Sequence, residues 1–157
     1  MIPDLHFLSF LTRWIHVAAM AVLLGGSLLV WVLSFRTRPD EANARSLIAL
    51  LVAEKYEVLF WIALGLLALT GVGNLGAYGR GLPAAASPWG VKLTWKLLAI
   101  LLLLLFSLLR TMLVARLRSA GDSLQPASQQ AMFRHFYALT TVFSLVILYL
   151  GLSLAHG

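Results

Sequence analysis

The sequence predicts an all-α integral membrane protein, a four-helix antiparallel bundle with up-down-up-down topology. Of its 157 residues, 61% are hydrophobic and only 11% are charged, whereas about a quarter of the residues in a soluble domain are charged. Four apolar stretches occur at about 10–35, 58–78, 91–114 and 135–155. Each is long enough to cross a hydrocarbon core of about 30 Å. Short connections favour antiparallel neighbours within one domain, residues 1–157.

Each stretch is expected to be a helix, because a bilayer provides no water for unpaired backbone groups and barrel-type alternation is missing from the sequence. Small residues in the first two stretches would allow close helix packing; they are Gly25, Gly26, Ser27, Gly65, Gly71 and Gly73. A short cytoplasmic helix is expected from about residue 40, ahead of the second stretch.

The third stretch follows a loop at 79–90 that is rich in Gly and Pro, and segment 119–130 is the break before the fourth stretch. The fourth stretch carries Tyr137, Thr141 and Ser144 at helical spacing. This polar stripe is expected to face the interior of the bundle.

Basic residues predict the orientation. Two loops with their flanks carry Arg36, Arg38, Arg45, Lys55, Arg110, Arg116, Arg118 and Arg134, and the opposite side carries Arg13, Arg80, Lys92 and Lys96. The positive-inside rule therefore places both termini and loop 79–90 on the non-cytoplasmic side. Glu54 and Glu57 are expected at a solvated start of the second helix, where the helix dipole favours acidic groups.

Composition excludes several classes of protein. Cysteine is absent, which removes disulfides, thiolate metal sites and cysteine nucleophiles. Residues 1–10 lack the features of a cleaved signal, so the first stretch is expected to remain as a span. The net charge of +6 comes from residues that flank apolar segments, which indicates contact with anionic lipid and not with nucleic acid. The sequence identifies no catalytic residue.

His16 and Lys96 are the main candidate site residues, because ionisable groups inside a bilayer are costly and mark function by default. The predicted topology places both about five residues below the same interface, with Lys92 one turn above Lys96. Arg13 lies near the mouth of the first helix, and His156 ends the fourth helix on this side. His6 is near the same end, whereas His135 is at the opposite end.

Three interpretations of His16 remain open. It could bind haem b as an axial ligand, with Lys92, Lys96 or Arg13 pairing with the propionates and His156, His6 or no residue on the second axial position. It could bind copper together with Met20, one turn along the same helix face. It could also be structural, with its ring hydrogen-bonded across helices to a Ser, a Thr or a carbonyl group, while the lysines extend towards the interface.

The motifs resemble the copper-resistance D (CopD) domain family over about residues 10–118. Trp14-Ile15-His16 followed by Gly25-Gly26 is similar to that family's first helix, and Thr70-Gly71 is similar to the end of its second. The run from Trp89-Gly90 through Lys96 to Arg110 resembles its third helix, with Trp89 in place of Tyr and Leu109 in place of Asn. The resemblance implies a bacterial inner-membrane protein that takes part in copper uptake or tolerance.

HemJ-type protoporphyrinogen oxidases are a second, weaker resemblance. Trp89-Gly90-Val91-Lys92-Leu93 is similar to their third-helix motif, but the Pro-Arg-Leu run expected after the first helix is missing. This resemblance implies haem at His16 with Lys92 as its partner, and leaves enzymatic activity undecided. Besides the lipid bilayer, the expected partners are a second copy of the chain or a redox or copper-carrying protein.

Overall fold

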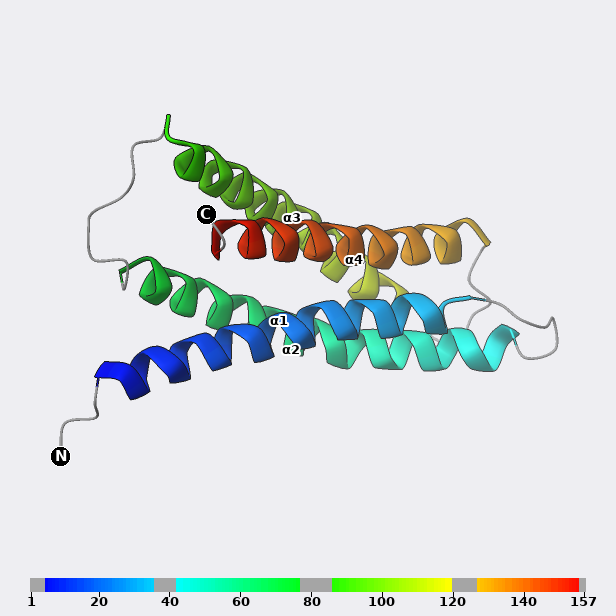
Figure 1. Ribbon diagram of the computed structural model, residues 1–157. Helices are drawn as coiled ribbons and strands as arrows, with labels where there is room; N and C mark the ends of the chain where they lie inside the picture. Colours follow the sequence, from blue (N-terminus) through cyan, green and yellow to red (C-terminus); the bar gives the residue numbers. More distant parts are fainter. Residues whose placement is uncertain (1–4, 36–41, 77–85, 120–126, 156–157) are drawn as a thin grey trace.

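The computed structural model describes residues 5–35, 42–76, 86–119 and 127–155, which form four α-helices (Figure 1). They are α1 (Leu5–Leu33), α2 (Ala42–Gly76), α3 (Pro88–Ser119) and α4 (Ala127–Ala155). Consecutive helices run in opposite directions. The start of α1, the end of α2, the start of α3 and the end of α4 therefore share one end of the bundle, the outer end; the opposite end is the inner end. The predicted all-α bundle is confirmed.

Three of these helices are long and apolar enough to cross a membrane, at His6–Leu33, Pro88–Ser119 and Ser128–Leu154 within the described residues. The protein is therefore a membrane protein that lies in a lipid bilayer. Because α1 and α3 run in the same direction (Figure 1), a chain that crosses in both must return between them. Of the described elements, α2 is the one that lies between them in the sequence, which supports the predicted fourth span.

α2 differs from the prediction at its start. It is one unbroken helix from Ala42 to Gly76, whereas a separate short cytoplasmic helix was expected ahead of the span. Residues 42–64 contain no Gly or Pro, so nothing in this part of the chain interrupts the helix. The charged residues Glu54, Lys55 and Glu57 consequently lie within α2 and not at its beginning.

α3 begins before the end of the predicted loop 79–90, because Ser87 and Pro88 form a helix start. The Ser87 hydroxyl accepts a hydrogen bond from the Gly90 backbone N–H at 3.0 Å, as an N-cap residue does. Pro88 follows at the first helical position, where its missing N–H has no cost. Residues 79–85 lie outside the described residues.

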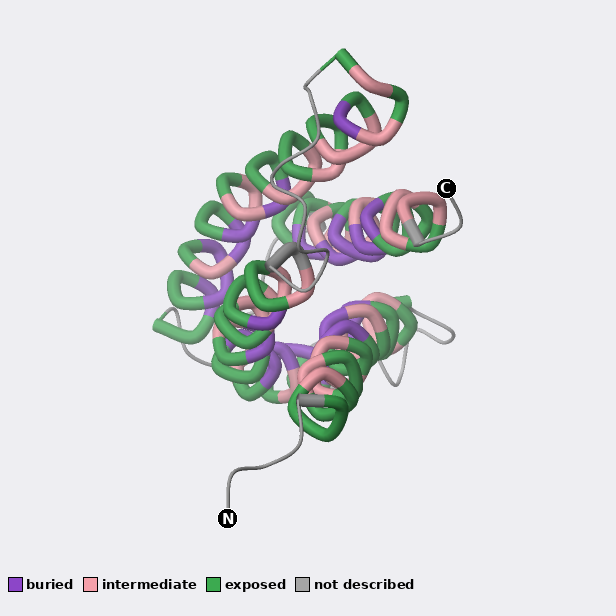
Figure 2. The backbone as a smooth tube through the Cα atoms, turned by 60° about the vertical axis from the view of Figure 1, so that its left-hand side comes forward, coloured by how far each residue is buried: buried purple, intermediate pink, exposed green. Residues whose placement is uncertain are grey.

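The helices pack mainly in the pairs α1–α2, α3–α4 and α1–α4, and the fourth neighbouring pair, α2–α3, is less closely packed. Figure 2 shows the buried residues on the faces that the helices turn towards one another, with exposed residues outside. An apolar layer crosses the middle of the bundle, formed by Met20, Leu23, Phe60, Leu103 and Ile147, all at most 9% exposed. The exposed outer faces are rich in Leu, Val and Phe, as lipid contact requires.

The glycines differ in their surroundings. A Cβ atom at Gly26 would overlap the ring of Tyr56 on α2, and one at Gly73 would lie 3.3 Å from Cγ2 of Thr12. The expected packing role is confirmed at these two positions. At Gly25 and Gly65 no described atom lies within 4 Å of a built Cβ, and the expectation is wrong there because these residues face outwards.

Candidate functional site

His16 lies at the interface of α1 and α2, in the outer half of the bundle. Its ring is partly buried, and its Nδ1 atom is 2.8 Å from Oγ1 of Thr70. Cε1 of His16 is 3.9 Å from the position of a Cβ at Gly71. The Thr70-Gly71 pair singled out in the sequence is therefore the part of α2 on which the imidazole rests, and the cross-helix hydrogen bond considered for His16 is present.

Met20 lies one turn further into the bundle than His16, on the same face of α1. It is 9% exposed and belongs to the apolar layer. Residues four apart on a helix are neighbours on its surface. The imidazole of His16 and the thioether of Met20 therefore lie next to each other, with Met20 nearer the centre of the bundle.

Lys92 and Lys96 extend from α3 to α4 in the same outer half. The Lys92 ammonium group donates a hydrogen bond to the Ser153 carbonyl oxygen at 3.3 Å. Nζ of Lys96 lies 3.4 Å from the position of a Cβ at Gly151, so the missing side chain there leaves space for the ammonium group. No hydrogen bond between described residues joins Lys96 to His16.

The other predicted site residues are less enclosed. Arg13 and His6 are exposed. His135 is exposed near the inner end, where its Nδ1 lies 2.6 Å from the Ala131 carbonyl oxygen. His156 lies outside the described residues. Among the residues that the structure does describe, no group of three His, Cys, Asp or Glu side chains gathers at one point.

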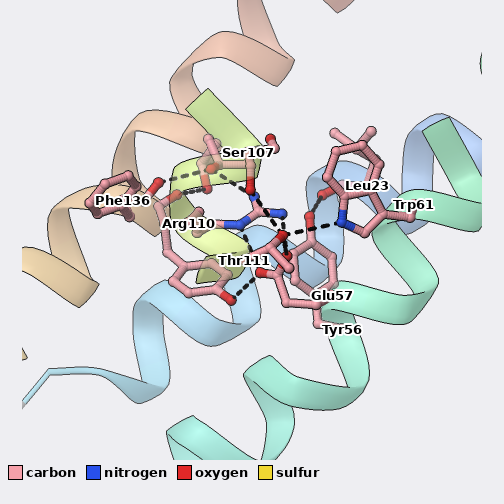
Figure 3. A network of polar contacts seen from close by, with 11 residues as sticks. Leu23, Tyr56, Glu57, Trp61, Ser107, Arg110, Thr111 and Phe136 are labelled. Carbon is pink, nitrogen blue, oxygen red and sulfur yellow. Dashed lines mark hydrogen bonds and ion pairs between the residues drawn. The ribbon is translucent and has the colours of Figure 1, made fainter. Parts of the chain in front are cut away.

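A second polar cluster, centred on Glu57 and Arg110, lies closer to the inner end and was missed from the sequence. Arg110 is 0% exposed and Glu57 5% exposed. The two groups form a bidentate pair, with Nε of Arg110 2.8 Å from Oε1 of Glu57 and Nη2 3.1 Å from Oε2. Figure 3 shows the two side chains meeting between α2 and α3. The expectation of a solvated Glu57 at a helix start is therefore wrong.

The rest of this Glu57–Arg110 cluster supplies the hydrogen bonds that a buried ion pair requires. Glu57 also accepts hydrogen bonds from the Tyr137 hydroxyl at 2.7 Å and the Thr111 hydroxyl at 2.6 Å. Nη1 of Arg110 donates to Oγ1 of Thr140 at 2.8 Å, and Nε1 of Trp61 donates to the Thr111 hydroxyl at 3.1 Å. Three helices, α2, α3 and α4, therefore meet at one ion pair.

Aromatic rings enclose the guanidinium group of Arg110. Its Cζ lies 4.2 Å from the ring centre of Phe60, 5.1 Å from that of Tyr137 and 5.4 Å from that of Tyr56. These distances are within the range of cation–π attraction. The Tyr56 hydroxyl in turn donates to the Leu23 carbonyl oxygen on α1 at 2.6 Å, so all four helices contribute to the surroundings of this charge.

Buried hydroxyl groups extend the cluster along α4. The predicted polar stripe is confirmed, since Tyr137, Thr141 and Ser144 are at most 5% exposed. Thr141 donates to the hydroxyl of Ser27 on α1 at 3.1 Å. Ser107 on α3 is an exception, because its fully buried hydroxyl has no hydrogen-bond partner among the described residues.

The apolar layer separates the two polar clusters in every helix. On α1 it comes between His16 and Ser27, on α2 between Thr70 and Glu57, and on α3 between Lys96 and Ser107; on α4 Ile147 lies between Ser144 and Gly151. The outer cluster, formed by His16, Thr70, Lys92 and Lys96, offers the imidazole nitrogen of His16, and Met20 in the adjoining apolar layer offers a sulfur atom. The inner cluster offers oxygen atoms and a guanidinium group that already bind one another.

A family model described as Copper resistance protein D matches residues 50–154. The matched range covers most of α2 and all of α3, and it extends through α4 to Leu154, further than the resemblance seen in the sequence. It includes Glu57, Thr70, Lys96 and Arg110, and leaves His16 and Met20 outside. No curated protein and no solved structure matches the chain.

Proposed function

Since the chain belongs to the copper resistance protein D family, we propose that it handles copper in uptake or tolerance and holds the ion at His16 and Met20. The observation that carries this proposal is the position of His16. Of the three histidines that the structure describes, His16 is the one that is partly enclosed among the helices, while His6 and His135 are exposed. Only its Nδ1 is hydrogen-bonded within the described residues, which leaves Nε2 for a metal ion.

The donor set suits Cu(I). Imidazole nitrogen binds copper in either oxidation state, and thioether sulfur selects the reduced ion. Because Met20 lies one turn inward of His16 and is buried, an ion arriving from the outer end meets the imidazole first and the thioether second. Copper in this role is cargo and not a resident cofactor, and the residues present fit it as a site with few ligands.

Lys96 makes this site suited to release. An ammonium group close to a bound cation repels it, and partial burial strengthens that repulsion relative to water. The proposed role of Lys96, with Lys92 behind it, is therefore to keep copper affinity low enough for exchange. Storage of the ion would instead favour a carboxylate in this place.

The proposed orientation places the outer end on the non-cytoplasmic side of a bacterial inner membrane. Arg110 is buried and no longer counts as a flanking charge. The inner side retains seven basic residues, Arg36, Arg38, Arg45, Lys55, Arg116, Arg118 and Arg134, against four on the outer side, Arg13, Arg80, Lys92 and Lys96. This asymmetry supports entry of copper from outside the cytoplasm.

A haem b protein is the second candidate, favoured by one observation. Lys92 and Lys96 extend into the same outer half as His16, and cations there could pair with propionates while Nε2 of His16 acts as the axial ligand. Haem would supply electron transfer or porphyrin oxidation, and the chain would supply ligation and charge. An absorption spectrum of the purified protein in both redox states separates the candidates, because a Soret band lost in His16→Gln supports haem.

The test of the copper proposal is a Cu(I) titration of the purified protein against a chromophoric chelator. We expect one ion per chain, with affinity reduced at least about 10-fold in His16→Gln and in Met20→Leu, since each substitution removes one ligand. Met20→Leu keeps the volume of the side chain and so preserves the apolar layer.

His135→Gln is the matched control, because this exposed histidine lies near the opposite end of the bundle. Its Cu(I) affinity should equal that of the unchanged protein. Equal affinities for all four proteins, or no binding by a folded sample, would remove His16 and Met20 as copper ligands.

A further inference from the structure

The two shortest hydrogen bonds of Thr70 together determine the form of the His16 ring. Its Oγ1 atom lies 2.6 Å from the Leu66 carbonyl oxygen, one turn back along α2. The same atom lies 2.8 Å from Nδ1 of His16 on α1. Both distances are typical of strong hydrogen bonds.

A threonine hydroxyl has one hydrogen atom to donate. A carbonyl oxygen has no hydrogen at all, so a separation of 2.6 Å between it and Oγ1 is favourable only when the hydroxyl donates to it. Two oxygen atoms facing each other with lone pairs at this distance would repel. The Thr70 proton is therefore directed to Leu66, and towards His16 Oγ1 acts as an acceptor.

The imidazole must then donate from Nδ1. In a neutral ring one nitrogen carries the proton and the other has a free lone pair. With the proton on Nδ1, the lone pair is on Nε2, which is the atom without a hydrogen bond among the described residues.

We propose that Thr70 is a positioning residue that holds His16 as the Nδ1–H tautomer and so presents the Nε2 lone pair to Cu(I). This inference rests on the proposed copper function and assigns to α2 a part in ligand geometry. Groups that orient a histidine ligand commonly change metal affinity about 10–100-fold when they are removed. The Thr70 hydroxyl would act through the His16 ring and would not contact the copper ion itself.

The first measurement is the tautomer itself, by nitrogen-15 magnetic resonance of histidine-labelled protein in lipid at a pH where imidazole is neutral. The signal of His16 is identified by its loss in His16→Gln. We expect the Nδ1–H form to predominate in the copper-free protein and in Thr70→Ser, which keeps the hydroxyl. In Thr70→Val, which has nearly the same shape without a donor or acceptor, both tautomers should appear.

The second measurement is Cu(I) affinity of the same variants, with Thr94→Val as the matched control. Thr94 is in the outer half of the bundle and its hydroxyl donates to the Gly90 carbonyl of its own helix at 2.9 Å. Its replacement removes the same kind of bond without approaching His16. We expect about a 10–100-fold loss for Thr70→Val, recovery in Thr70→Ser and no loss in Thr94→Val.

The outcomes separate this inference from the proposed function. A predominant Nε2–H form in the unchanged protein, or a tautomer unaffected by Thr70→Val, overturns the role of Thr70 whatever copper does. If the tautomers are as expected but the protein binds no Cu(I), the copper role of His16 and Thr70 is overturned. The hydrogen bond from Nδ1–H of His16 to Thr70 would then still hold. An equal loss of Cu(I) affinity in Thr70→Ser and Thr70→Val would mean that Thr70 contributes only to packing.

Discussion

Glu57 and Arg110 form a complete ion pair away from water. Each oxygen of the carboxylate accepts two hydrogen bonds, from Arg110 and Tyr137 or from Arg110 and Thr111. A buried pair is tolerated when its remaining donors and acceptors are satisfied in this way. The cluster therefore neutralises two charges in the bundle interior and fixes α2 against α3, which pack less closely than the other neighbouring helices do.

Removing one member of this pair should be severely destabilising. Glu57→Gln leaves the Arg110 charge buried without a counter-charge, and we expect the free energy of unfolding to fall by about 3–5 kcal/mol. Unfolding in mixed detergent micelles, followed by helical circular dichroism, measures this. Glu54→Gln is the control, since the Glu54–Arg118 pair is 40% and 45% exposed and should contribute less than about 1 kcal/mol. Similar losses in both variants would contradict the importance given to the buried pair.

Replacing Ser107 should not lower the free energy of unfolding, in contrast to Glu57→Gln. Its hydroxyl is buried without a partner among the described residues, and leaving a polar group unsatisfied costs about 1–3 kcal/mol. Replacing Ser107 with Ala removes that cost and leaves a small cavity, so the unfolding free energy should stay level or rise. The same micelle assay measures it. A fall of about 2 kcal/mol or more, on the scale of an unsatisfied-group penalty, would mean that the hydroxyl has a partner.

At the level of the helices, the number, order and direction of the elements could be predicted from the sequence. Four long apolar stretches without strand-type alternation can cross a bilayer only as helices. The helix boundaries were less well predicted. The second span was taken to begin after Glu57, yet Glu57 lies well inside α2, and Arg110, which was counted as a flanking charge, is buried. The prediction assumed that a charged side chain inside a span is costly. Opposite charges that pair between helices offset this cost.

The candidate site was predictable only in part. His16, Lys92, Lys96 and Met20 were identified because polar or metal-binding groups stand out against apolar neighbours. A cross-helix hydrogen bond of His16 was one of three open alternatives. Its partner Thr70 is 54 positions away in the sequence, so only the packing of α1 against α2 reveals this contact. The signal that could have revealed the inner cluster was Arg110 itself, an arginine followed by Thr111 at the end of a motif that was already noted.

Contact between α1 and α2 depends on a missing side chain at Gly26. A methyl group there meets the Tyr56 ring, whose hydroxyl is bonded to Leu23 and which therefore cannot move freely. We expect Gly26→Ala to lower the unfolding free energy by about 1–3 kcal/mol through overpacking. Gly25→Ala is the matched neighbour, with no described atom within 4 Å of the added carbon, and should be neutral or slightly stabilising. Equal effects at the two positions would contradict the close approach.

For the molecule as a whole, the arrangement is a bundle with two polar clusters and an apolar layer between them. The outer cluster is divided between two helix pairs, with His16 and Thr70 on α1 and α2, and Lys92 and Lys96 directed from α3 to α4. The inner cluster joins α2, α3 and α4 through bonds that are already satisfied. Under the proposed function, a copper ion at His16 would exchange with the outer side, and its passage inward would require the inner cluster to rearrange.

Under the proposed function, the side from which copper would reach His16 depends on the orientation of the bundle, which can be measured directly. A periplasm-dependent phosphatase fused after Gly157 should be active in a bacterial host, and the same enzyme inserted between residues 120 and 126 should be inactive. A cytoplasm-dependent fluorescent reporter should give the reverse pattern. If the phosphatase is active only at 120–126, the outer end faces the cytoplasm and His16 would receive copper from inside the cell.

The central claim is that His16 holds copper, and X-ray absorption at the copper edge of the Cu(I)-loaded protein tests it most directly. We expect a reduced ion with few ligands, including one imidazole nitrogen and one thioether sulfur. The imidazole contribution should vanish in His16→Gln, and the sulfur contribution in Met20→Leu. Copper bound without imidazole, or a spectrum unchanged by His16→Gln, would contradict the claim.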